Sequence, residues 1–187
     1  TYELGKTLSS RRTGMIASWM LISSFYFIFW ARVGNTDMLN IAGMMLAILW
    51  YFKHRDNSGF FSYFVFFFIL AIASLLKGLI APAVTLVVLI PDLLNENHWK
   101  KHLKLSLFVA FILALLIYLS PFIASAYLNP NHYAESGLIE VFRENFLRYV
   151  SPFDHQGSYY IYFLYLPLAI APWILFTLPA LITFPVR

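Results

Sequence analysis

The sequence predicts an all-α protein, a polytopic bundle of about six membrane-spanning helices with an interfacial amphipathic helix in its longest connector. Two observations predict this class. Of the 187 residues, 60% are hydrophobic and only 12% are charged, which is too apolar a composition for a soluble domain of this length. The apolar residues also gather into six runs, several of them near the length of about 20 residues that a spanning helix needs.

The first three predicted spans cover residues 14–31, 38–52 and 60–76. Gly34 and Asn35 form a tight turn between the first two spans. Thr36 stands where a helix N-cap is expected, and Asp37 falls in the first turn of the second span.

The other three predicted spans cover residues 79–94, 105–128 and 159–184. The last run is interrupted by Pro167, Pro172 and Pro179. Proline is tolerated in a membrane helix when neighbouring groups satisfy the carbonyls that it leaves unpaired, so we expect a single irregular span.

The basic residues of the connectors divide unequally between the two sides of such a bundle, with nine on one side and four on the other. The richer side holds Lys6, Arg11, Arg12, Lys53, Arg55, Lys100, Lys101, Lys104 and Arg187, and the poorer side holds Arg32, Lys77, Arg143 and Arg148. Because cytoplasmic loops carry the excess of Lys and Arg, the second set is predicted to face outward. The outward side is the periplasm if the protein is bacterial and the lumen if it is eukaryotic. Of these we expect the periplasm, for an integral protein of the bacterial inner membrane.

The longest connector, residues 129–158, is therefore predicted to be an outer loop. Within it, residues 137–150 show helical periodicity, with apolar side chains on one face and a favourable i,i+4 pair, Glu144 and Arg148, on the other. An amphipathic helix beside membrane spans is expected to lie in the interface, where it would cover an outward-facing site.

Several chemistries are excluded by what the sequence lacks. The chain has no cysteine, which excludes disulfides, thiol catalysis and Cys-ligated metals, and it has no phosphate-binding glycine loop, nucleophile elbow or zinc-binding helix motif. No cofactor, metal or nucleic-acid partner is predicted. Residues 1–12 do not have the pattern of a signal peptide, and both ends look cut, so we expect residues 1–187 to be an internal piece of one larger membrane domain.

Charged residues at the ends of apolar runs are the first candidates for function, since a charge buried in a bilayer costs several kcal/mol. Arg32 and Asp37 flank the first outer turn. Asp37 has two interpretations: it complements the dipole of the helix that follows, or it is a catalytic carboxylate that acts as a base or anchors an acceptor hydroxyl or amine.

Lys77 closes an almost purely apolar run and is followed by Gly78. One interpretation is a lysine that extends its ammonium group to the membrane interface. The other is a point charge that binds a phosphate, with Gly78 allowing a head group to approach the backbone.

A third stretch, ENFLRYVSPFDHQGSYYIYF, combines a guanidinium group that fits phosphate, Arg148, with polar and aromatic side chains, His155, Tyr159 and Tyr160. His155 would bind substrate or serve as an ordinary polar residue, and no ligand spacing supports a metal. The tyrosines would stack on a sugar, although an aromatic belt at the membrane boundary explains them as well.

The order of these segments resembles the integral-membrane glycosyltransferases that use polyprenyl-phosphate sugars, such as the aminoarabinose transferases of lipid A and the protein mannosyltransferases. Four stretches carry the resemblance: LGKTLSSRRTGMIASWMLISS, WARVGNTDMLNIAGMMLAI, ASLLKGLIAP and ENFLRYVSPFDHQGSYYIYFLYLPLAIAPWILFTLPAL. The resemblance implies a GT-C type fold, a catalytic role for Asp37 and substrate binding by Arg32, Lys77, Arg148, His155, Tyr159 and Tyr160.

The sequence departs from that family in two respects: the acidic motif of the family's first outer loop is absent from these residues, and GSYY follows where the family more usually has a proline-containing sequence. The expected activity is transfer of a sugar from a polyprenyl-phosphate donor to a lipid or protein acceptor, with membrane lipids as the surroundings, and we expect residues 1–187 alone to be inactive. The alternatives are a transporter or flippase of a lipid-linked anion, and a structural membrane subunit.

Overall fold

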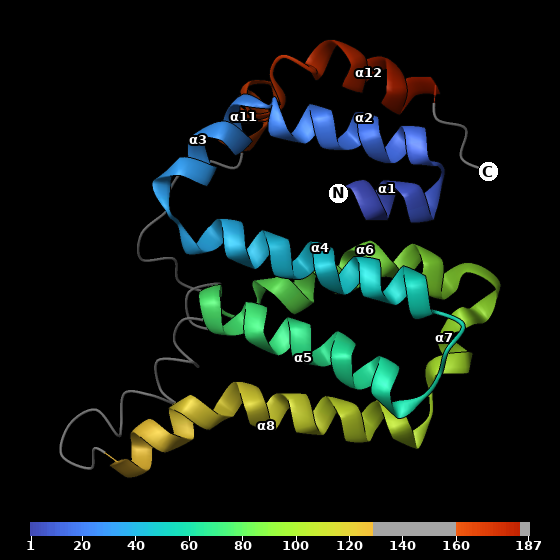
Figure 1. Cartoon of the computed structure of the whole chain (residues 1–187), viewed down its shortest axis with the longest axis vertical. Helices are drawn as coiled ribbons and strands as arrows, with labels where there is room; N and C mark the ends of the chain where they lie inside the picture. The colour runs from blue at the N-terminus through green and yellow to red at the C-terminus, as the bar shows by residue number, and fades with distance from the viewer. Residues whose placement is uncertain (129–159, 184–187) are drawn as a thin grey trace. The chain divides into compact units, whose positions relative to one another are not determined.

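The computed structural model describes residues 1–128 and 160–183, and within these residues every regular element is a helix. The predicted all-α class is thus confirmed for the described part of the chain (Figure 1). The elements are α1 (Tyr2–Leu8), α2 (Arg11–Ile22), α3 (Phe25–Val33), α4 (Thr36–His54), α5 (Phe60–Lys77), α6 (Ile80–Leu94), a 3₁₀ turn (Asn95–Asn97), α7 (His98–His102), α8 (Leu105–Leu128), α11 (Ile161–Ile170) and α12 (Ile174–Thr183).

The number of membrane-length helices is smaller than the sequence predicted. Among the described residues, α5 and α8 are long and apolar enough to cross a membrane, and the bent pair α2 and α3 makes a third candidate if it is one span. Helix α6 is apolar but has only 15 residues, and the last predicted span is divided into α11 and α12. Helix lengths therefore support two or three spans rather than six.

The break in the first predicted span lies at two adjacent serines, and the two helices that meet there are bent by 64°. The Ser23 hydroxyl donates to the carbonyl oxygen of Trp19 at 2.5 Å, and the Ser24 hydroxyl donates to that of Leu21 at 2.8 Å. Serine side chains that take up helix carbonyls in this way compete with the backbone ladder and favour a bend.

The chain divides into two compact units, the first comprising Thr1–Met38 and Asp154–Arg187 and the second Leu39–Phe153. In the first unit, α1 and α2 lie side by side through two glycines, since a Cβ on Gly5 would stand 2.8 Å from the Cα of Gly14 (Figure 1). Ser23 also contacts the segment between α11 and α12, because the indole N–H of Trp173 donates to the Ser23 hydroxyl at 2.9 Å.

In the second unit, α4 and α5 approach closely through small residues. A Cβ on Gly43 would stand 2.6 Å from the Cβ of Ala73, so any larger residue at position 43 would require the two helices to move apart. One turn earlier in α4, the buried amide of Asn40 donates to the carbonyl oxygen of Ala73 at 2.8 Å. Small residues and interhelical hydrogen bonds of this kind are the usual basis of helix association in membranes.

Helix α8 covers another side of α5. Ala71, Ala114 and Tyr118 form the buried cluster between the two helices, and the rings of Phe67 and Phe111 meet edge to face at 5.4 Å. Many other apolar side chains of α8 are exposed, including Leu105 at 78% and Ile112 at 54%. That exposure is expected of a helix whose outer face contacts lipid.

Candidate functional site

The predicted catalytic residue, Asp37, lies in a local hydrogen-bonded turn at the start of α4. Its carboxylate accepts from the side-chain amide of Asn35 at 2.9 Å, and its backbone N–H donates to the side-chain oxygen of Asn35 at 3.1 Å. Asn35 therefore caps this helix, where the sequence predicted Thr36, which is instead the first helical residue. The half-buried carboxylate also lies in the first helical turn, where the helix dipole favours a negative charge.

Arg32 and Asp37 stand on the two sides of the Gly34 turn, as the sequence predicted. Arg32 is exposed in the last turn of α3, and Gly34 ends that helix with a φ of 67°, a left-handed conformation that favours glycine. Both charged residues belong to the first unit, whereas Lys77 belongs to the second.

Lys77 is the last residue of α5 and its side chain is exposed. Gly78 follows with φ 73° and ψ −166°, a region that is open essentially to glycine alone, and its N–H donates to the carbonyl oxygen of Ser74 at 2.7 Å. This turn fixes the backbone of a cation at the end of a membrane-length apolar helix. The carbonyl end of a helix also favours a positive charge electrostatically.

Other predicted site residues fall outside the described part of the chain. These are Arg148, His155 and Tyr159, together with the amphipathic helix predicted over residues 137–150. Tyr160 is described and exposed, and its carbonyl oxygen accepts from the N–H of Phe163 at 3.1 Å at the start of α11. Within the described residues, no group of three or more His, Asp or Glu side chains is placed to hold a metal ion.

A cavity of about 440 Å³ opens inside the second unit, among α4, α5, α6, α7 and α8. Leu70, Leu89 and Ala114 give it an apolar wall, and it extends from Arg55 and Trp99 at one end of these helices to Ser74 and Leu79 near the other. Its volume is in the range typical of small-molecule sites. This cavity was not predicted, because its walls come from five separate helices.

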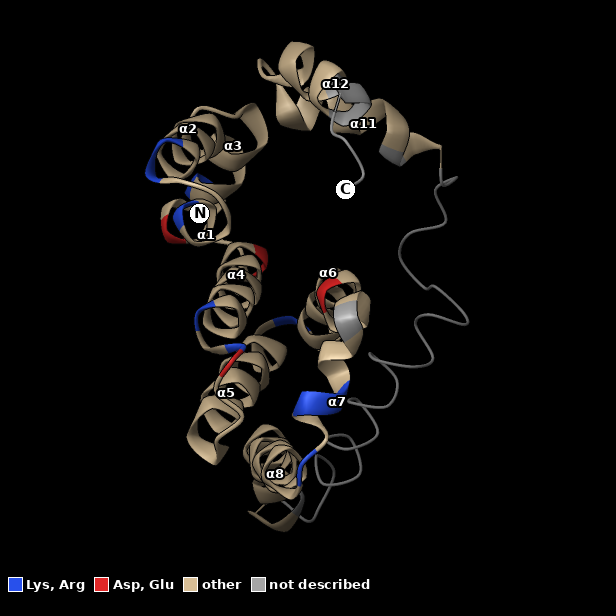
Figure 2. Ribbon diagram, turned by 90° about the vertical axis from the view of Figure 1, so that its right-hand side faces the viewer, with Lys and Arg blue, Asp and Glu red and all other residues tan. Residues whose placement is uncertain are grey.

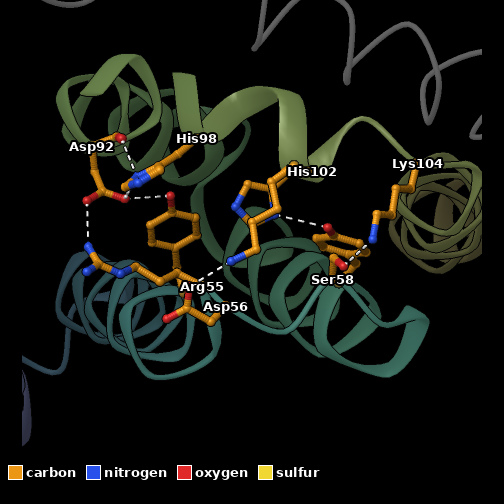
Figure 3. A network of polar contacts seen from close by, with 10 residues as sticks. Arg55, Asp56, Ser58, Asp92, His98, His102 and Lys104 are labelled. Atoms are coloured by element: carbon orange, nitrogen blue, oxygen red, sulfur yellow. Dashed lines mark hydrogen bonds and ion pairs between the residues drawn. The ribbon is translucent and has the colours of Figure 1, made fainter. Parts of the chain in front are cut away.

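A network of polar side chains, which we term the polar belt, crosses one end of the second unit (Figure 3). Its members are Tyr51, Arg55, Asp56, Ser58, Tyr63, Asp92, His98, Lys101, His102 and Lys104. They come from the end of α4 and the connector to α5, the start of α5, the end of α6, α7 and the connector to α8, so the belt joins the two connectors of that end. Figure 2 shows Lys and Arg around α7 and at the end of α4, whereas α5 and α8 are largely without charge.

Asp92 is the centre of the larger part of the belt. Its carboxylate accepts from the Tyr51 hydroxyl at 2.7 Å and from the Arg55 guanidinium at 2.9 Å, while its backbone oxygen lies 3.1 Å from Nδ1 of His98. The Asp92 side chain is only 15% exposed, and a carboxylate shielded from water in this way is stabilised by its hydrogen-bond and ion-pair partners.

The smaller part of the belt contains the buried imidazole of His102. Its Nδ1 lies 3.0 Å from the Tyr63 hydroxyl, and the Tyr51 ring centroid lies 5.9 Å from its own. Nearby, the exposed Asp56 carboxylate accepts from the Lys101 ammonium at 2.7 Å, and this cation lowers the pKa of Asp56. In the sequence, these basic residues indicated only the orientation of the chain in the membrane. A lone Asp92 in the last turn of an apolar run was the signal that could have revealed the belt.

Burial of His102 gives a prediction for pH. Burial lowers the pKa of His102 below its ordinary value of 6.5, with Lys101 and His98 acting in the same direction and Asp92 and Asp56 opposing it. The unfolded chain therefore takes up the proton first as the pH falls. The stability that neutral His102 contributes is fully present above about pH 6.5 and is lost as the pH falls below that value.

Thermal unfolding of the protein in detergent between pH 7.5 and 5.5 measures this loss. A His102→Gln variant, whose side chain still offers Tyr63 a partner but does not titrate, should show a weaker dependence on pH. The same dependence in both proteins would contradict the assignment to His102.

Comparisons of this chain with protein-family models, with curated proteins and with solved structures gave no match.

Proposed function

We propose that this protein is a membrane glycosyltransferase of the GT-C type, which moves a sugar from a polyprenyl-phosphate donor to a lipid or protein acceptor at the periplasmic face of a bacterial inner membrane. The observation that carries the proposal is the Lys77–Gly78 turn, which fixes the backbone of a cation at the end of a membrane-length helix. A donor whose chain lies in the bilayer presents its phosphate at this depth.

The order of the four family-like stretches supports the same function, and the charge count supports the sidedness, with four basic residues predicted outside and nine inside. The proposal includes the six-span arrangement, in which α4, α6 and the α11–α12 pair join the three candidate spans.

The proposed reaction is a displacement at the anomeric carbon of the sugar. An acceptor oxygen attacks this carbon and forms the new glycosidic bond, while the bond to the phosphate oxygen breaks and polyprenyl phosphate leaves with the electron pair. Lys77 and Arg148 stabilise the charge on the departing phosphate, and Asp37 orients the acceptor hydroxyl and receives its proton. Arg32, His155, Tyr159 and Tyr160 hold the substrates.

One observation favours the alternative of a transporter or flippase for a lipid-linked anion. The bent α2–α3 pair is a broken apolar segment, and transporters commonly build their binding sites at such breaks. The ionic residues of the predicted site that the structure describes, however, lie at helix ends: Arg32 and Lys77 are in last turns and Asp37 is in a first turn. This placement favours a site at the membrane surface over one at mid-depth.

Replacing Lys77 with alanine should lower sugar transfer by about tenfold or more, because the developing phosphate charge loses a fixed cation. The assay uses the full-length protein in membranes and polyprenyl-phosphate pentose and hexose labelled in the sugar, and it measures both transferred label and protein amount.

Lys53 provides the matched control. It lies in the last turn of α4, as Lys77 lies in the last turn of α5, but on the predicted cytoplasmic side of the membrane. Lys53→Ala should retain transfer, and Lys77→Arg should retain part of it. Near-normal transfer by Lys77→Ala at normal expression would exclude the assigned role.

A further inference from the structure

The polarity of the side chains that line the cavity of the second unit changes along its length. Its deeper wall is apolar, whereas the end beneath the polar belt is lined by the side chains of Arg55, Trp99 and His102. A molecule that fits this space has an apolar chain and a polar head at the belt.

The belt end carries an excess of positive charge, which indicates the sign of the head group. Residues 53–56 and 92–104 contain five basic and three acidic residues, a net charge of +2 with histidines neutral. The Arg55 guanidinium has five N–H groups and donates one of them to the Asp92 carboxylate. The Lys100 ammonium lies 5.6 Å from the Trp99 ring centroid, and the Trp99 side chain is 40% exposed, an arrangement typical of the membrane interface.

A buried hydroxyl lies deeper in the same cavity. Thr85 is fully buried and lines the cavity, and its hydroxyl is one of the few buried side-chain groups of the described residues with no hydrogen-bond partner. Such a group costs free energy unless a ligand supplies an acceptor. Thr85 precedes Asp92 by seven helical residues, about 10 Å along α6.

We propose that this cavity binds one anionic glycerophospholipid, with its phosphate at Arg55 and Lys100, an ester carbonyl accepting from the Thr85 hydroxyl, and one acyl chain along Leu70 and Ala114. The head-group layer of a leaflet is roughly 5–8 Å deep, so ester carbonyls lie below the phosphate at a depth comparable with that of Thr85. A polyprenyl phosphate has no ester carbonyl, and this site is at the opposite end of α5 from Lys77. The proposal is thus independent of the transfer reaction.

The test is lipid binding to the full-length protein in detergent, followed by native mass spectrometry with three probes: diester phosphatidylglycerol, its dialkyl ether analogue and diester phosphatidylcholine. The wild type should bind one diester phosphatidylglycerol about fivefold more tightly than either of the other lipids. This comparison needs no variant and does not depend on transfer activity.

Two variants and a control sharpen the test. Thr85→Val, which removes the hydroxyl at nearly constant volume, should abolish the difference between ester and ether lipids. Lys100→Ala should weaken phosphatidylglycerol binding about fivefold, since each basic residue near an anionic surface contributes about 1 kcal/mol. Lys6→Ala, an exposed lysine of the first unit, should change nothing.

Equal binding of the ester and ether lipids by the wild type would overturn the role of Thr85. Equal binding of phosphatidylcholine and phosphatidylglycerol would overturn the anionic head-group site. Displacement of phosphatidylglycerol by undecaprenyl phosphate at equal concentration would assign the cavity to the sugar donor instead.

Discussion

Asp92→Ala should lower the free energy of unfolding of the second unit by about 3 kcal/mol, because it removes the acceptor at the centre of the polar belt. Hydrogen bonds to a charged group contribute about 1.5–3 kcal/mol each when they are shielded from water. The bond from Tyr51 is the larger contribution, since Asp92 is only 15% exposed, whereas the bond from the 43% exposed Arg55 is screened by solvent.

The absence of cysteine from the chain makes the measurement direct. A single reporter cysteine at Ala47, a fully buried position, is labelled only when the unit opens, so an unfolding titration of this background gives the free energy. Asp56→Ala is the matched control within the belt, because the Asp56 side chain is 86% exposed although it also binds a cation. It should leave the titration midpoint unchanged, and equal effects of the two substitutions would show that the belt does not depend on Asp92.

Gly43→Leu should destabilise the second unit by about 3 kcal/mol, since the contact between α4 and α5 has no space for a side chain at this position. Even a single Cβ would stand 2.6 Å from the Cβ of Ala73, so the helices must separate and lose the hydrogen bond between Asn40 and the Ala73 carbonyl. Overpacking a close contact typically costs about 1–3 kcal/mol before such losses are added.

The neighbouring residue on α4 supplies the control. Ala42 is exposed, so Ala42→Leu should change the free energy of unfolding by less than about 0.5 kcal/mol in the same titration. Gly43→Ala should be partly rescued by Ala73→Gly, which moves the methyl group across the contact. A Gly43→Leu variant as stable as Ala42→Leu would contradict the close approach of these helices.

The sequence predicted the helices whose apolar runs are uninterrupted. The run 60–76 matches α5 to within one residue, and the run 105–128 has the bounds of α8. Apolarity alone does not show where a helix bends. The bend at Ser23 depends on hydroxyl bonds to carbonyls and on Trp173, which is 150 residues away along the chain.

The candidate site was predictable only where its geometry is local. The turn of Asp37 and the turn of Lys77 each lie within a few residues, so residue types and spacing indicated them. Hydrogen bonds of the polar belt that join its two connectors pair residues 37 to 46 positions apart, from Arg55 and Asp92 to Ser58 and Lys104, and no periodicity encodes such a pairing. The belt was therefore missed, although each of its charges was visible in the sequence.

The measurement that tests the central claim most directly is the fate of a polyprenyl-phosphate sugar that carries one label in the sugar and another in the phosphate. The full-length protein is reconstituted in vesicles with candidate lipid and protein acceptors. We predict that the sugar label moves to an acceptor while the phosphate label stays with the polyprenyl chain, and that Lys77→Ala slows this separation. Movement of intact donor across the vesicle membrane, with both labels still together, would contradict the transferase and favour the transporter.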